Sequence, residues 1–151
     1  MSRVRRWTDA SVEDVWDVLA DGWSYADWVI GTWRIRDVSG DWPRPGARIQ
    51  HSVGIWPALV DDVTTVRYCE PYRRLVLDAY GGPFGRARVE LRLHGRNDGC
   101  RISMTESPRS GLGRLVPGPL VAAALLPRNG QSLHRLLALA ERRADLRPGR
   151  G

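Results

Sequence analysis

Lysine is absent from the 151-residue chain, whose 23 basic residues are all arginines set against 17 acids, for a net charge of +6 and a pI near 10.3. Such a charge invites a nucleic-acid interpretation. Its distribution argues against one, because residues 1–6 and 142–151 contribute +3 each while residues 7–141 hold 16 arginines and 16 acids. We therefore expect no nucleic-acid partner.

Long hydrophobic runs are also missing. The longest, Leu120 to Leu126, lies between two prolines and falls far short of the roughly 20 residues that a membrane span needs. Residues 1–9 are polar, and no basic start is followed by the long apolar run of a signal peptide. These two absences predict a cytoplasmic protein without stable membrane insertion.

Cysteine is scarce, and the two present, Cys69 and Cys100, have no Cys-x-x-Cys spacing. Without a secretory signal they are expected to be ordinary buried thiols and not a disulfide. No spacing of His, Cys or carboxylates is typical of a metal site, and Gly111-x-Gly113 lacks the further glycines of a nucleotide-binding loop. The sequence predicts neither a metal nor a cofactor.

Aromatic and apolar residues are well represented, with seven tryptophans and 42% hydrophobic residues, which excludes a disordered chain. The length suits a single domain of residues 1–151, with a core of about 3–144 and an Arg-rich tail at 145–151.

The hydrophobic periodicity changes twice along the chain. Ser11 with Asp14 has the spacing of a capping box before a helix over about 12–20, and Ser24 with Asp27 begins a second short helix. Apolar spacing predicts a last helix over about 131–145. Alternating residues predict about seven antiparallel strands, at 3–8, 32–38, 47–55, 58–68, 74–80, 86–94 and 101–106. Helices and strands that are segregated in this way predict an α+β fold with a curved antiparallel sheet around the last helix.

Several short motifs occur in a characteristic order. They are Ala10-Ser11-Val12-Glu13-Asp14-Val15-Trp16, Trp42-Pro43 with Pro45-Gly46, Glu70-Pro71 with Arg73-Arg74-Leu75, Thr105-Glu106, and Arg128-Asn129 with Ser132-Leu133. Together they resemble the SRPBCC superfamily, which joins START lipid-transfer domains, birch-pollen-type allergens and polyketide cyclases/dehydrases. The resemblance covers residues 3 to 144 and implies a helix-grip fold with a deep pocket for a small hydrophobic molecule such as a lipid, a polyketide or an aromatic compound.

Strand alternation indicates which side chains would enter such a pocket. His51 shares a face with Ile49 and Val53, Glu106 shares one with Ile102 and Met104, and Trp33 shares one with Ile35. Buried charges are costly unless they are paired, so we expect a hydrogen bond between His51 and Glu106. The pair is either a satisfied internal polar pair that anchors a ligand or the acid and base of a cofactor-independent cyclase/dehydratase.

The remaining ligand candidates are mostly aromatic. Trp28, Trp33 and Trp56 are placed to stack on a flat ligand, and Val53 and Met104 would add apolar lining, whereas Trp16 belongs to a helix stripe and is expected in the core. Arg67 alternates with Val66 and Tyr68 and is therefore expected to point into solvent, unless a bulge at Asp61-Asp62 reverses the strand.

One segment stays open to several interpretations. Residues Leu112 to Leu126 are apolar and broken by three prolines, which is compatible with a pocket lid, a dimer contact, a membrane-touching element or a kinked approach to the last helix. A homodimer is accordingly possible. The favoured hypothesis is a binding or carrier domain for a small hydrophobic ligand, ahead of the enzyme and of a helper protein that uses the Arg-rich surface.

Overall fold

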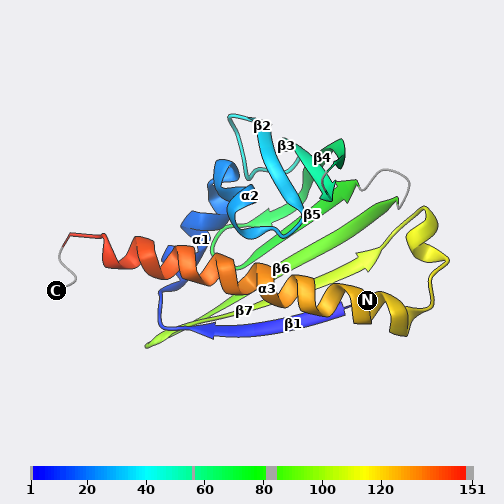
Figure 1. Ribbon diagram of the computed structural model, residues 1–151. Coiled ribbons are helices and arrows are strands. Elements are labelled where there is room, and N and C mark those ends of the chain that lie inside the picture. The colour runs from blue at the N-terminus through cyan, green and yellow to red at the C-terminus, as the bar shows by residue number, and fades with distance from the viewer. Residues whose placement is uncertain (1, 56, 81–84, 149–151) are drawn as a thin grey trace.

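The protein is described by a computed structural model that covers residues 2–55, 57–80 and 85–148. One antiparallel sheet with the strand order β1-β7-β6-β5-β4-β3-β2 curves around a long helix (Figure 1). The strands are β1 (Ser2–Thr8), β2 (Thr32–Val38), β3 (Arg48–Ile55), β4 (Ala58–Glu70), β5 (Arg74–Tyr80), β6 (Arg86–Arg96) and β7 (Gly99–Pro108). The helices are α1 (Val12–Ala20), η1 (Gly22–Ser24), α2 (Tyr25–Trp28), η3 (Leu112–Arg114) and α3 (Gly118–Asp145). This confirms the predicted α+β architecture, including the two short helices after the first strand.

Helix α1 begins at the predicted capping box. The Ser11 side chain accepts a hydrogen bond from the Asp14 backbone amide, and the Asp14 carboxylate accepts one from the Ser11 amide. This exchange satisfies donors that the first helical turn otherwise leaves unpaired. The helix buries Val15, Trp16 and Leu19, as the apolar spacing predicts, so Trp16 is a core residue.

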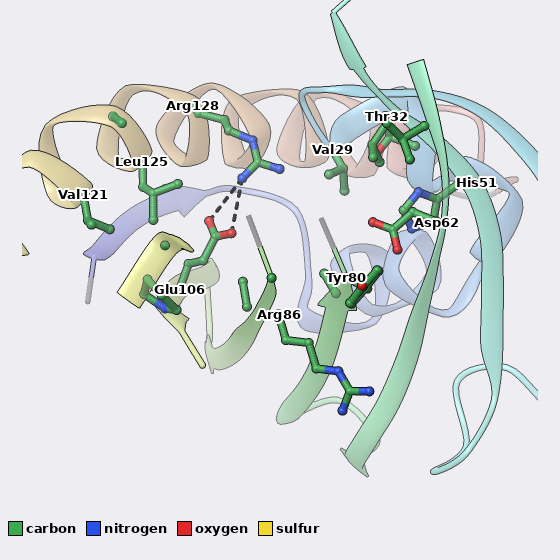
Figure 2. Close-up of a pocket in the computed structure, with 18 of the residues that line it drawn as sticks. Val29, Thr32, His51, Asp62, Tyr80, Arg86, Glu106, Val121, Leu125 and Arg128 are labelled. Carbon is green, nitrogen blue, oxygen red and sulfur yellow. Dashed lines mark hydrogen bonds and ion pairs between the residues drawn. The ribbon is translucent and has the colours of Figure 1, made fainter. Parts of the chain in front are cut away.

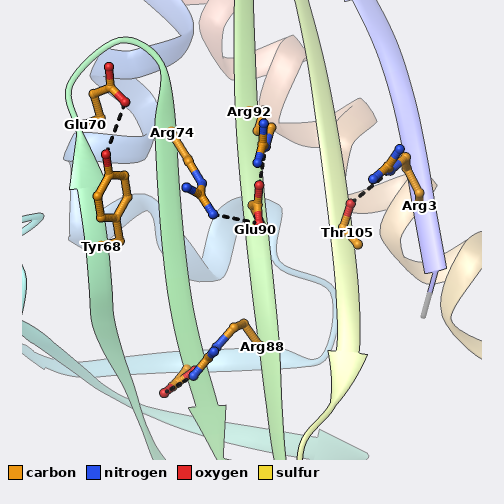
Figure 3. A network of polar contacts seen from close by, with 9 residues as sticks. Arg3, Tyr68, Glu70, Arg74, Arg88, Glu90, Arg92 and Thr105 are labelled. Carbon is orange, nitrogen blue, oxygen red and sulfur yellow. Dashed lines mark hydrogen bonds and ion pairs between the residues drawn. The ribbon is translucent and has the colours of Figure 1, made fainter.

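Strand β6 shows how the alternation places the two faces of the sheet. Val89, Leu91 and Leu93 are buried on the concave face, while Arg88 and Arg92 lie on the convex face. There Arg74 and Arg92 both pair with Glu90, and Arg88 Nε donates to Asp78 Oδ1 at 2.9 Å (Figure 3). These partly exposed ion pairs lie on the outer surface of the sheet, while the inner face of β6 is apolar.

The core occupies one end of the concave face. The buried side of α3, formed by Leu133, Leu136, Leu137 and Ala140, packs there together with α1 and with strands β1 and β7. Burial of Val15, Leu19 and Ile102 in the same cluster completes this end. The hydrophobic driving force of the fold is thus concentrated under the C-terminal half of α3.

Helix α3 is longer than its periodicity predicts. It begins at Gly118 instead of near Gln131, so that residues 118–126 are helical and Pro127 lies inside the helix. Proline removes one backbone hydrogen bond, which is why the sequence pattern suggests a break there. The structure therefore turns the second part of the Leu112 to Leu126 segment into helix, with Pro119 in the first turn, where proline is tolerated.

Both cysteines are free thiols, as predicted, with Cys69 partly buried on β4 and Cys100 buried on β7. Burial raises the pKa of the Cys100 thiol to about 11, so it is inert at neutral pH.

Candidate functional site

A cavity of about 780 Å³ lies between the concave face of the sheet and the N-terminal half of α3 (Figure 2). Apolar side chains from strands β3, β4 and β6 and from α3 line much of it: Val53, Val60, Ala87, Val121 and Leu125. A volume of this size is typical of pockets that hold small organic molecules. The lining suits a ligand with mostly apolar surface.

A cluster of polar side chains forms one wall of the cavity. His51 and Asp62 are direct partners in the β3–β4 register, so their side chains emerge on the same face, and Thr64 follows Asp62 by two residues. His51 Nε2 lies 2.7 Å from Thr64 Oγ1, which is in turn 3.4 Å from the Tyr25 hydroxyl of α2. We call His51, Asp62, Thr64 and Tyr25 the histidine wall; all four residues are buried.

Burial sets the protonation of this wall. It lowers the pKa of His51 to about 4, with a smaller contribution from the Arg36 guanidinium, and it raises the pKa of Asp62 to about 6 against an opposing hydrogen bond from the Val63 amide. At pH 7 the imidazole is neutral. Among the residues that the structure describes, its buried Nδ1 has no hydrogen-bond partner, which is costly for a polar atom.

A second polar cluster stands on the opposite wall, where β7 meets α3. The Glu106 carboxylate accepts hydrogen bonds from Arg128 Nη1 at 3.2 and 3.3 Å (Figure 2). It also accepts one from Asn129 Nδ2 at 2.8 Å. Asn129 also donates to Ser2 Oγ on β1, and Arg128 Nε donates to the Ile30 carbonyl. We call Glu106, Arg128 and Asn129 the glutamate wall. These contacts join α3 to β7, to β1 and to the segment before β2.

The expected hydrogen bond between His51 and Glu106 is wrong. Both side chains line the cavity, as the alternation predicts, but they bond to Thr64 and to Arg128 with Asn129 instead. Strands β3 and β7 are separated by three strands, which puts them on the order of 19 Å apart along the sheet. Face alternation identifies residues on one surface but says nothing about their separation across it.

The other predicted ligand residues fall into three groups. Val53 lines the cavity. Trp28 and Met104 are buried in the core, and neither belongs to the described residues that line the cavity. The inward orientation of Trp33 is wrong, because a register irregularity in β2 leaves it 56% exposed, and Trp56 lies outside the described residues.

Arg67 points outward, as predicted, and pairs with Asp78 at 3.2 Å on the convex side of the sheet. The β4–β5 register shifts between Val66 and Tyr68, and not at Asp61-Asp62. Because of this shift Tyr68 also faces outward, where the Arg74 guanidinium lies over its ring. The alternation therefore places Arg67 correctly and Tyr68 on the wrong face.

Sequence reasoning missed most of the polar residues that complete the two walls: Tyr25, Asp62, Thr64, Arg128 and Asn129. Arg128, Arg135 and Arg142 recur every seven residues, a spacing typical of the solvated side of a helix, so the sequence pattern gives no sign that Arg128 reaches the cavity. A signal for Asp62 and Thr64 was available in the sequence. They are two residues apart and so share one face of a strand, and that strand follows the His51 strand and was expected to pair with it.

No group of three or more His, Cys, Asp or Glu side chains suited to a metal ion occurs in residues 2–55, 57–80 and 85–148. Within the same residues, no helix is long and apolar enough to cross a membrane.

With the fold and cavity described, the chain can be compared with known proteins. The profile of the family described as "Polyketide cyclase / dehydrase and lipid transport" matches residues 2–141. The chain belongs to this family. It is therefore a member of the SRPBCC superfamily, and its sheet and long helix form the helix-grip fold that the motifs indicate. A search of the curated proteins found no match.

Several solved structures share the fold. A protein from Nitrosomonas europaea superposes with a TM-score of 0.72 at 15% identity, covering 95% of both chains. The di-domain ARO/CYC StfQ from the steffimycin biosynthetic pathway gives 0.73 at 12% identity over 95% of this chain, which spans 51% of that one. Ara h 8.0201 gives 0.67 at 8% identity over 91% and 95% of the two chains. Identities this low establish the fold and leave the ligand to be argued from the cavity.

Proposed function

We propose that this protein binds a small, largely hydrophobic molecule in the cavity under α3. The observation that carries the proposal is the cavity itself, an apolar space of about 780 Å³ with one polar cluster on each of two facing walls. Apolar surface supplies the affinity and the polar groups orient the ligand. Membership of a family described by polyketide cyclisation and lipid transport is in keeping with such a ligand.

The two walls favour a ligand with polar groups toward both ends. The His51 imidazole and the Asp62 carboxyl group line the cavity at the histidine wall, and Arg128 provides a cation at the glutamate wall. A wholly apolar molecule would displace water from these polar groups without replacing its hydrogen bonds, which costs on the order of 1–3 kcal/mol. An elongated aromatic or acyl compound that carries a hydroxyl or carbonyl group satisfies both walls.

A fluorescent probe tests this function directly. We expect 1-anilinonaphthalene-8-sulfonate to bind the native protein with a blue-shifted emission. Ala124→Trp, which adds bulk inside the cavity, should abolish the signal, whereas Ala138→Trp, on an exposed position of the same helix, should leave it unchanged. Equal binding by both variants would place the probe elsewhere and refute the cavity as the binding site.

A second candidate function is proton-transfer catalysis of the cyclase/dehydratase type. It is favoured by Asp62, whose pKa of about 6 lies close to working pH, beside a neutral imidazole in an apolar cavity. In this candidate Asp62 removes a proton from a carbon next to a carbonyl group and His51 holds the carbonyl or hydroxyl group. Glu106, the acid expected from the sequence, is engaged with Arg128 and Asn129 and would position the substrate.

Hydrogen–deuterium exchange separates the two candidates. Catalysis predicts that the protein accelerates exchange at the C–H bonds next to the carbonyl of 1-tetralone in D₂O, measured by NMR. Asp62→Asn should remove at least about 100-fold of that acceleration, in the range expected for loss of a general base. If the native protein gives no acceleration while the fluorescent probe still binds the cavity, binding is the function and the catalytic candidate fails.

A further inference from the structure

Residues 111–120 form an exposed apolar lip between β7 and the buried part of α3. Four aliphatic side chains of this lip are strongly exposed: Leu112 (54%), Leu115 (79%), Val116 (43%) and Leu120 (61%). In Figure 1 the segment is the yellow end of the molecule, beyond β7 and far from the C-terminus. Single exposed apolar residues are ordinary, but a contiguous group of this kind is typical of a surface that binds a protein, a membrane or a ligand.

The same lip is the mouth of the cavity. Gly113, Val116 and Leu120 line the cavity from the lip, and Val121 continues the lining along α3. Whatever covers the lip therefore also faces the opening of the binding site.

Charged residues in the stretch of chain that contains the lip have one sign. No aspartate or glutamate occurs from residue 107 to residue 140, although the whole chain holds 17 acids in 151 residues. Arg109 and Arg114 are exposed at the lip, and Arg86, also exposed, starts the neighbouring strand. The apolar side chains thus lie among cations without a nearby acid in their own segment, which favours an anionic partner.

The base of the lip is fixed to the sheet. The Arg109 amide donates to the Arg86 carbonyl at 2.7 Å, and the Arg86 amide donates to Ser110 Oγ at 3.1 Å. Gly85 passes so close that a Cβ there would lie 2.0 Å from the Ser110 carbonyl oxygen. The lip therefore projects from a defined attachment point.

We propose that the lip docks the protein on an anionic lipid bilayer, with its leucines and valine in the interface and Arg86, Arg109 and Arg114 against the headgroups. Exposed aliphatic residues among arginines are the composition of surface-binding segments. A symmetric contact between two copies would bring these arginines against one another, and a protein interface would be richer in the Trp and Tyr residues that dominate such contacts. Docking needs no ligand in the cavity, so it stands apart from the proposed function.

Vesicle flotation tests the docking. We expect the native protein to float with vesicles of phosphatidylcholine containing about 30% phosphatidylglycerol, at least about ten-fold more strongly than with phosphatidylcholine alone. Leu115→Asp combined with Leu120→Asp should lower the partition coefficient by at least about ten-fold. Leu146→Asp is the matched control, because Leu146 is 78% exposed at the opposite end of α3, and it should float like the native protein. Arg109→Gln and Arg114→Gln should each lower the partition coefficient by about five-fold at low salt.

Three results would overturn the proposal. They are no flotation of the native protein, equal flotation of the Leu115/Leu120 variant, and an equal loss in the Leu146 control. A native dimer that the Leu115/Leu120 variant dissociates, without vesicle binding, would assign the lip to self-association, and a co-purifying acidic protein in place of vesicle binding would assign it to that partner. Measuring the fluorescent probe on the same variants without vesicles shows separately whether the cavity still binds.

Discussion

The two halves of α3 do different work. Residues 129–145 bury Leu133, Leu136 and Ala140 completely, whereas residues 118–128 leave Leu120 and Leu126 at 61% and 38% exposure and roof a cavity. The difference lies beneath the helix: α1 packs against its C-terminal half, where Arg143 donates to the Asp17 carbonyl, and the cavity lies beneath its N-terminal half. One continuous helix therefore covers both the packed core and the cavity.

The glutamate wall marks the boundary between these regions. Arg128 and Asn129 lie between the two halves of α3 and hold Glu106 of β7. Asn129 is fully buried, while the side chain of Arg128 is 38% exposed toward the cavity. The hydrogen bonds from Arg128 and Asn129 to Glu106 hold α3 at a fixed distance from β7, and this distance limits the depth of the cavity.

The largest expected difference between the halves is in stability. Leu136→Ala should lower the free energy of unfolding by about 2–5 kcal/mol because it leaves a void in the packed end. Leu125→Ala, at the cavity, should cost less than about 1 kcal/mol, since its side chain already borders open space. Urea unfolding followed by circular dichroism measures both. Equal losses would show that the cavity end is packed as tightly as the core.

The boundary itself should show coupling. Arg128→Ala leaves the Glu106 carboxylate buried with one partner fewer and should cost about 1–3 kcal/mol. In the double variant with Glu106→Gln much of that loss should return, because the buried charge is gone. Additive effects in the cycle would mean that the pair does not hold the helix.

The histidine wall predicts opposite pH dependences for two residues. Asp62 has a raised pKa, so its contribution to the free energy of unfolding is complete below about pH 4 and is lost as the pH rises through 6. His51 has a lowered pKa, so its contribution is complete above pH 6.5 and is lost as the pH falls through 4. Between pH 4 and pH 7, the free energy of unfolding of Asp62→Asn should rise relative to that of the native protein by on the order of 1–3 kcal/mol. That of His51→Gln should fall relative to the native protein by a similar amount over the same interval. Parallel profiles for the two variants would refute this assignment.

The convex face should be the least sensitive region. Arg92→Gln removes one of the two arginines on Glu90 (Figure 3) and should change the free energy of unfolding by less than about 1 kcal/mol, because exposed ion pairs contribute little. The effect should shrink further at high salt. A loss as large as that of Leu136→Ala would mean that the outer network, and not the core, stabilises the sheet.

Alternation and apolar spacing were enough to predict the architecture, since each strand and helix has one buried face that its own residues reveal. Strand β6 and helix α1 are the plainest cases. The site was predicted only in part. His51, Val53 and Glu106 do line the cavity, but their polar partners lie on other elements, Thr64 on the next strand and Arg128 with Asn129 on the last helix. The pattern of one strand alone does not identify these partners.

Two errors have local causes that sequence patterns do not contain. Strict alternation predicts that Trp33 and Tyr68 face inward. Both side chains are exposed instead, because the register shifts next to Trp33 in β2 and next to Tyr68 in β4. The early start of α3 has a different origin: the helix continues through Pro127, which a propensity argument treats as a break. Tertiary context decided all three.

The central claim is that the cavity holds a small hydrophobic molecule, and native mass spectrometry of freshly purified protein tests it most directly. The account predicts a mass above the 17.0 kDa of the bare chain, from an organic compound that denaturation releases. The extra mass should be lost in Ala124→Trp and kept in Ala138→Trp. A bare mass for the native protein, together with no binding of the fluorescent probe, would contradict the account.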